Sequence, residues 1–110
     1  MSAVVAEREL DYFGAEGRQA GVVQLFAPEP DDGCWHCDYR IAWPGYERTF
    51  GILGEDCWQA LHLAMHVVPS AIFATDDFKS GRIGVWGGKL NSYEEICRLF
   101  DVKPVEGPAT

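Results

Sequence analysis

The chain has 110 residues, 47% of them apolar, and nine basic against seventeen acidic side chains give it a formal charge of −8. This length and apolar content predict one folded domain with its own core. The excess of carboxylates argues against direct binding to nucleic acid or to anionic membranes, because it repels phosphates. A basic protein partner is compatible with the charge, as is solubility alone.

The sequence shows no targeting or membrane-spanning segment. The first residues, MSAVVAEREL, lack the basic region of a signal peptide and reach charged residues before any apolar core. No apolar run approaches the ~20 residues of a membrane span. We therefore expect a cytoplasmic protein whose four cysteines are thiols.

Alternating apolar and polar residues predict an antiparallel meander in the first half of the chain. The expected strands cover residues 3–13, 18–27, 34–43 and 46–52. The alternation is sharpest in the third strand, whose apolar face carries Trp35, Cys37, Tyr39, Ile41 and Trp43. Residues 82–86 are a candidate fifth strand, which Gly84 weakens.

Two helices are expected to follow. The longer one covers residues 55–75, with Glu55 and Asp56 at the positive end of its dipole. Its predicted core-facing stripe consists of Cys57, Trp58, Leu61, Ala64, Met65, Val68 and Ile72. Pro69 interrupts the pattern, and the phase of the stripe favours one bent helix over two. A capping box from Ser92 to Glu95 begins a shorter helix that ends near Asp101.

These elements predict an α+β fold: an antiparallel meander of four to five strands, the long helix packed on one face, and a short C-terminal helix beside it. Residues 1–102 form the single domain, and residues 103–110, with two prolines and no pattern, form a flexible tail.

Cys34, His36 and Cys37 form the first candidate site, because Cys-x-x-Cys occurs in redox enzymes and zinc sites. An extended backbone would place the two cysteine Cα atoms about 10 Å apart, too far for a disulfide. The chain has no second ligand pair at zinc-finger spacing. A buried Cys37 and a surface Cys34 are therefore the preferred interpretation, and a metal or thiol site is the alternative.

His62 and His66 are the second candidate pair, because four residues of helix place both on one side. The metalloprotease motif requires Glu after the first histidine, and Leu63 stands there. A third ligand such as His36 would have to cross the sheet. We expect boundary histidines and no metal, and no other cofactor is indicated.

Residues 81–89 are rich in glycine but lack the spacing and the Ser or Thr of a phosphate-binding loop. Trp86, within this segment, is a candidate partner-contact residue. No catalytic signature is present.

Three stretches resemble a known family. They are Ala6-Glu7-Arg8-Glu9-Leu10, then Pro28-Glu29-Pro30-Asp31-Asp32-Gly33 with a following Tyr39-Arg40-Ile41, and Gln59-Ala60-Leu61-His62-Leu63-Ala64. The chain is similar over residues 4–88 to small bacterial proteins classed as a domain of unknown function. The resemblance implies a bacterial, cytoplasmic setting and no activity.

The expected function is therefore a non-enzymatic, acidic module that binds or regulates a basic protein partner. Two alternatives stay open. One is a metal- or thiol-dependent site around Cys34, His36 and Cys37, and the other is a small-molecule or enzymatic site without a recognisable motif.

Overall fold

A computed structural model describes residues 2–104, and a single antiparallel sheet of seven strands dominates it. The strands are β1 (Val4–Gly14), β2 (Gly17–Phe26), β3 (Glu29–Asp31), β4 (Cys34–Trp43), β5 (Tyr46–Gly54), β6 (Ile83–Val85) and β7 (Gly88–Lys89). The helices are α1 (Cys57–Phe73), α2 (Asp76–Lys79) and α3 (Tyr93–Leu99). This arrangement confirms the predicted α+β class.

The first five strands form the expected meander, with β4 at its centre. β5 pairs with β4 along its full length, from Trp43 opposite Tyr46 to Trp35 opposite Gly54. On the other side of β4, β2 and β3 pair with successive parts of the strand, and Ala27 and Pro28 between them belong to neither strand. β6 pairs with the far edge of β1, so the sheet order is β3-β4-β2-β1-β6-β7.

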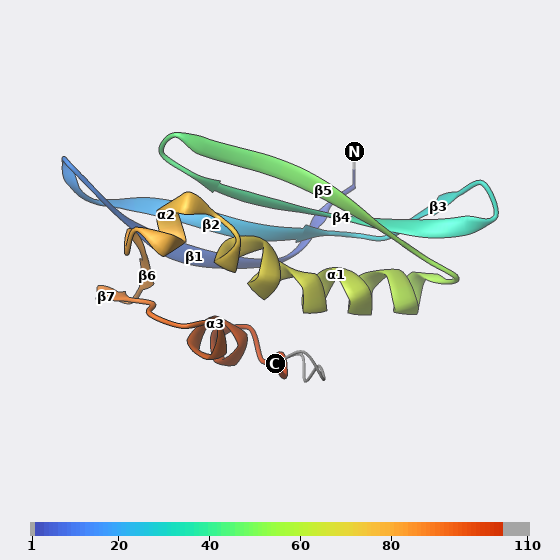
Figure 1. The fold of residues 1–110 in the computed structure, drawn as a ribbon. Coiled ribbons are helices and arrows are strands. Elements are labelled where there is room, and N and C mark those ends of the chain that lie inside the picture. Colours follow the sequence, from blue (N-terminus) through green and yellow to red (C-terminus); the bar gives the residue numbers. More distant parts are fainter. Residues whose placement is uncertain (1, 105–110) are drawn as a thin grey trace.

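Both α1 and α3 lie on one face of the sheet, and no helix within residues 2–104 covers the opposite face (Figure 1). We call the face toward α1 the inner face and the opposite face the outer face. The predicted inner face of β4 is confirmed, with Cys37, Tyr39, Ile41 and Trp43 buried and Trp35 half-buried. Gly54 permits close contact with α1, because a Cβ there would lie 2.5 Å from the Ala60 backbone nitrogen.

The helix α1 starts with reciprocal side-chain caps. Asp56 is its N-cap, and its Oδ1 accepts a 2.8 Å hydrogen bond from the Gln59 N–H. The Gln59 side chain accepts one in return from the Glu55 N–H at 2.7 Å. Glu55 and Asp56 therefore precede the first turn and do not lie within it.

The predicted core-facing stripe of α1 is wrong for three residues in the first half of the helix. The buried residues are Ala60, Ala64, Val68, Pro69 and Ile72. Trp58 is 82% exposed, Met65 is 41% exposed, and Cys57 is exposed. The small side chains at positions 60 and 64 allow the helix to approach β5 closely, which turns the bulkier residues toward the margin.

Pro69 lies inside α1 without breaking it, which confirms one helix over two. The residue is buried, and the next position, Ser70, has its Oγ 3.3 Å from the Tyr93 hydroxyl of α3. Pro69 therefore lies next to a point where α1 contacts α3.

Short elements were missed by periodicity. Residues 29–31 and 88–89 pair as strands, and residues 76–79 form a helical turn. The predicted strand at 82–86 is confirmed as β6, and the Ser92 cap begins α3 as expected. Lys103 and Pro104 are in neither helix nor strand, and the rest of the predicted tail lies outside the described residues. No helix within residues 2–104 is long and apolar enough to cross a membrane.

Candidate functional site

The outer face of the sheet carries a polar ladder that crosses four strands. Gln24 Nε2 donates to Glu7 Oε1 at 2.8 Å, and Arg40 Nη1 donates to Gln24 Oε1 at 3.1 Å. Arg40 Nε then donates to Glu47 Oε2 at 2.9 Å. These residues come from β1, β2, β4 and β5, so one continuous network joins the meander strands.

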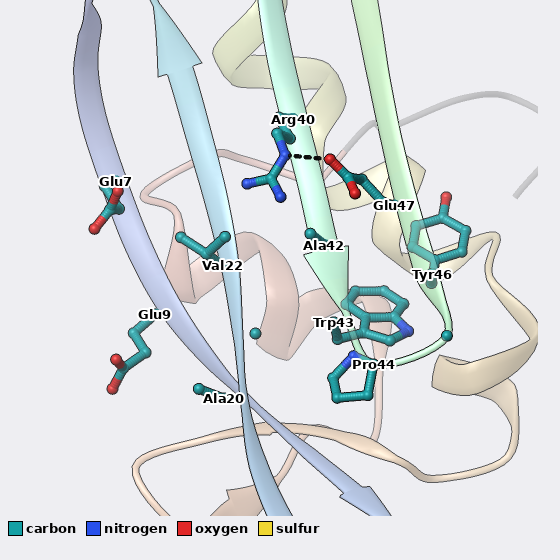
Figure 2. Close-up of a pocket in the computed structure, with 12 residues that line it drawn as sticks. Glu7, Glu9, Ala20, Val22, Arg40, Ala42, Trp43, Pro44, Tyr46 and Glu47 are labelled. Atoms are coloured by element: carbon teal, nitrogen blue, oxygen red, sulfur yellow. Dashed lines mark hydrogen bonds and ion pairs between the residues drawn. The ribbon is translucent and has the colours of Figure 1, made fainter.

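Next to this ladder, the outer face is hollowed. The hollow has a volume of about 720 Å³ and extends from β1 to the β4–β5 turn. Figure 2 shows Glu7 and Glu9 along β1, Ala20 and Val22 on β2, and Ala42 on β4. The hollow exists because the residues between its charged margins are small.

The margins of the hollow are acidic. Three carboxylates line it, from Glu7, Glu9 and Glu47, against one cation, Arg40. Arg40 is already engaged by Glu47, and Glu9 forms no ion pair or side-chain hydrogen bond within residues 2–104. An incoming cation would therefore meet a free carboxylate beside small apolar side chains.

The structure separates the predicted Cys34, His36 and Cys37 group. Cys37 lies on the inner face with no exposed surface, and burial raises the pKa of its thiol, with a smaller contribution from the charge of Asp38. Cys34 and His36 alternate with it on the outer face, where the His36 Nδ1 lies 3.3 Å from Asp38 Oδ1. All four cysteines are free.

His62 and His66 lie against each other at the exposed surface of α1, with their ring planes tilted by 37°. Their ring centroids are 4.0 Å apart, and His66 Nδ1 lies 2.9 Å from the His62 carbonyl oxygen. His36 lies on the outer face, so the sheet separates it from His62 and His66, as predicted. Among the described residues, no group of three or more His, Cys, Asp or Glu side chains is placed to hold a metal.

Trp86 is exposed, as predicted, but lies away from the outer-face hollow. It belongs to the β6–β7 turn and its side chain is 80% exposed. The guanidinium of Arg8 lies 6.0 Å from its ring centroid, and Arg8 alternates with Glu7 and Glu9 along β1. Trp86 is therefore associated with the inner face, and the glutamates with the outer face.

The outer-face residues were not predicted as a site, because they come from separate strands that are far apart in the sequence. One signal was present: Ala20, Val22 and Ala42 occupy outward positions where long polar side chains are usual. Only strand register shows that these small residues are neighbours, with Val22 paired to Ala42.

Fold and site define an α+β domain whose meander sheet carries helices on one face and an acidic hollow on the other. Residues 6–94 match the profile of DUF6968, a domain of unknown function, and the chain belongs to this family. The match extends beyond the predicted resemblance at residue 88 and reaches the first turn of α3. No curated protein and no solved structure matches the chain.

Proposed function

We propose that this protein is a non-enzymatic binding module that takes a basic segment of a partner protein on the outer face of its sheet. The observation that carries the proposal is the hollow of about 720 Å³ with Glu7, Glu9 and Glu47 at its margins. Its lining contains no serine, threonine, cysteine or histidine, the residues of the common nucleophile–base pairs, which favours binding over catalysis. The cytoplasmic, bacterial setting predicted from the sequence is part of this proposal.

The chemistry of the hollow favours Arg or Lys side chains. Their aliphatic stems can lie over Ala20, Val22 and Ala42, and their charged ends can reach Glu9. The polar ladder fixes Glu7 and Glu47 in place before binding, which lowers the entropy cost of pairing. The overall charge of −8 would attract the same partner at longer range.

A direct test uses a fluorescent peptide of alternating arginine and alanine, titrated into the purified protein at low and moderate salt. Replacing both Glu9 and Glu47 by glutamine is expected to weaken binding roughly threefold to tenfold, the size of two exposed ion pairs. Ala42→Arg, which fills the hollow and adds a like charge, is expected to abolish binding.

Glu16→Gln is the matched control for Glu9→Gln alone, because each removes one charge and Glu16 is an exposed carboxylate in the β1–β2 turn that does not line the hollow. Equal losses for these two single variants would mean that the peptide senses only net charge. That result would overturn the assignment of the site.

A further inference from the structure

Trp86 occupies a backbone conformation that a bulky residue rarely adopts. Trp86 and Gly87 form the two-residue loop between β6 and β7, with φ of 51° and 84°. Positive φ at both positions defines a type I′ turn, in which Asn, Asp or Gly is strongly preferred at the first position. A tryptophan there costs free energy that Asn would not.

The turn is held in place from another part of the chain. The backbone N–H of Gly87 donates to Asp11 Oδ2 at 2.6 Å, and the other carboxylate oxygen of Asp11 lies 3.3 Å from Arg18 Nε. Burial does not explain the tryptophan, since 80% of its surface is exposed. A strained and exposed aromatic residue on a fixed turn indicates a contact residue.

Beside Trp86 lies a hollow of about 420 Å³ between the turn and α3. Val85, Leu90 and Leu99 give it apolar walls, and Arg8 and Arg98 line it as well. Two carboxylates also line it, from Glu95, whose Oε1 accepts the Asn91 N–H, and from Asp101.

The two arginines distinguish this hollow from the outer face. Neither forms an ion pair within the described part of the chain. The Arg8 guanidinium lies about equally far from the Trp86 and Phe100 rings, at 6.0 and 5.9 Å. A guanidinium that packs on aromatic rings keeps the donors in its plane for a carboxylate.

We propose that the hollow beside Trp86 binds an acidic segment of a partner protein. An apolar side chain of that segment packs on Trp86, and an adjacent carboxylate pairs with Arg98 and Arg8. This site goes beyond the proposed basic-partner site, since it has the opposite charge preference and lies toward the opposite face. The protein would then hold two different segments at once.

The test uses a labelled peptide with one phenylalanine flanked by aspartates. A second peptide, in which asparagines replace the aspartates, is the uncharged control. The wild-type protein is expected to bind only the acidic peptide, and Trp86→Asn to weaken binding by about tenfold or more. Because Asn suits the turn, the same variant is expected to unfold at an equal or higher temperature. A structural role for Trp86 would instead lower the unfolding temperature.

Two charge variants sharpen the test. Arg98→Gln is expected to weaken binding of the acidic peptide, and Asp101→Asn to strengthen it, because Asp101 repels the ligand. Asn also suits the positive φ of 54° at position 101. The arginine peptide should bind Trp86→Asn, Arg98→Gln and Asp101→Asn as tightly as it binds the wild-type protein. The two proposed sites are therefore tested independently.

Three results would overturn the proposal: equal binding of the acidic and asparagine peptides, unchanged binding by Trp86→Asn, or weaker binding by Asp101→Asn. A fourth contradicting result could come from sedimentation of the peptide-free protein, which measures self-association. If Trp86 supports self-association and no acidic peptide binds, the occupant is a second copy and the proposal is wrong.

Discussion

The carboxylate of Asp11 accepts a hydrogen bond from the backbone N–H of Gly87, 76 residues later in the chain, at a distance of 2.6 Å. This bond joins the first strand to the β6–β7 turn, which follows α1 and α2 in the chain. Asp11 is buried, because the turn lies against it. The position of Trp86 therefore depends on a residue of the first hairpin.

Asp11→Ala is expected to lower the free energy of unfolding by about 1–3 kcal/mol, because it leaves the Gly87 N–H without its acceptor. Asp11→Asn keeps an acceptor oxygen and is expected to lose less, mainly the ion pair with Arg18. Urea unfolding of both variants measures the difference. Equal losses would show that charge, and not the bond to the turn, makes Asp11 important.

Gly54→Ala is expected to destabilise the protein by about 1–3 kcal/mol, because the added Cβ would overlap the backbone of Ala60 at the start of α1. Gly51→Ala on the same strand is the matched control. There the added Cβ meets only the Asp38 carboxylate oxygen, at 2.9 Å, and that side chain can move. Thermal unfolding should separate the two variants, and similar effects would contradict the close contact at Gly54.

The Trp43 indole fixes α2, since its Nε1 donates to Asp77 Oδ2 at 2.7 Å. Trp43→Phe and Asp77→Ala are each expected to destabilise the protein. In a double-mutant cycle their effects should couple by about 1 kcal/mol. A coupling energy of zero, measured by urea unfolding, would show that the bond does not stabilise the fold.

Thiol labelling should follow the burial of the four cysteines. Cys57 is exposed and is expected to react first, with half-buried Cys34 slower. Buried Cys37 and Cys97 should react only after unfolding. The variant Cys57→Ser identifies which phase of the labelling reaction belongs to Cys57. If zinc protected Cys34 from labelling in the native protein, that result would instead support the metal site.

Stability is expected to fall as the pH rises above about 9. Burial raises the pKa of the Cys37 thiol above its ordinary value of 9.0. Burial also raises the pKa of the Tyr39 hydroxyl above its ordinary value of 10.0, and the charge of Tyr46 makes a smaller contribution in the same direction. Between the ordinary and the raised pKa, the unfolded chain releases a proton that the folded chain retains, so unfolding becomes more favourable. The limit is about 1.4 kcal/mol per pH unit for each group.

Urea unfolding from pH 8 to 11 under reducing conditions measures this loss. In Cys37→Ala the decline should begin closer to the ordinary pKa of Tyr39. An unchanged profile in that variant would mean that Cys37 does not contribute.

The sequence by itself determined the meander and its inner face. From Trp35 to Ile41, apolar side chains alternate with polar ones, and a strand with one buried face requires that period. The capping box at Ser92 likewise determined the start of α3, because its hydrogen bonds join residues within four positions. Local patterns of this kind need no knowledge of the rest of the chain.

Tertiary structure decided which helical face is buried and where the sites lie. Trp58 and Ala60 both fit a helix, and the close approach to Gly54 selected Ala60 for the core. The outer-face hollow needs Ala20, Val22 and Ala42 side by side, and strand register alone brings them together. Trp86 was a candidate contact residue from the sequence, but Arg8 beside its ring and Asp11, which accepts the N–H of the neighbouring Gly87, are more than seventy positions away. No local pattern encodes such distant contacts.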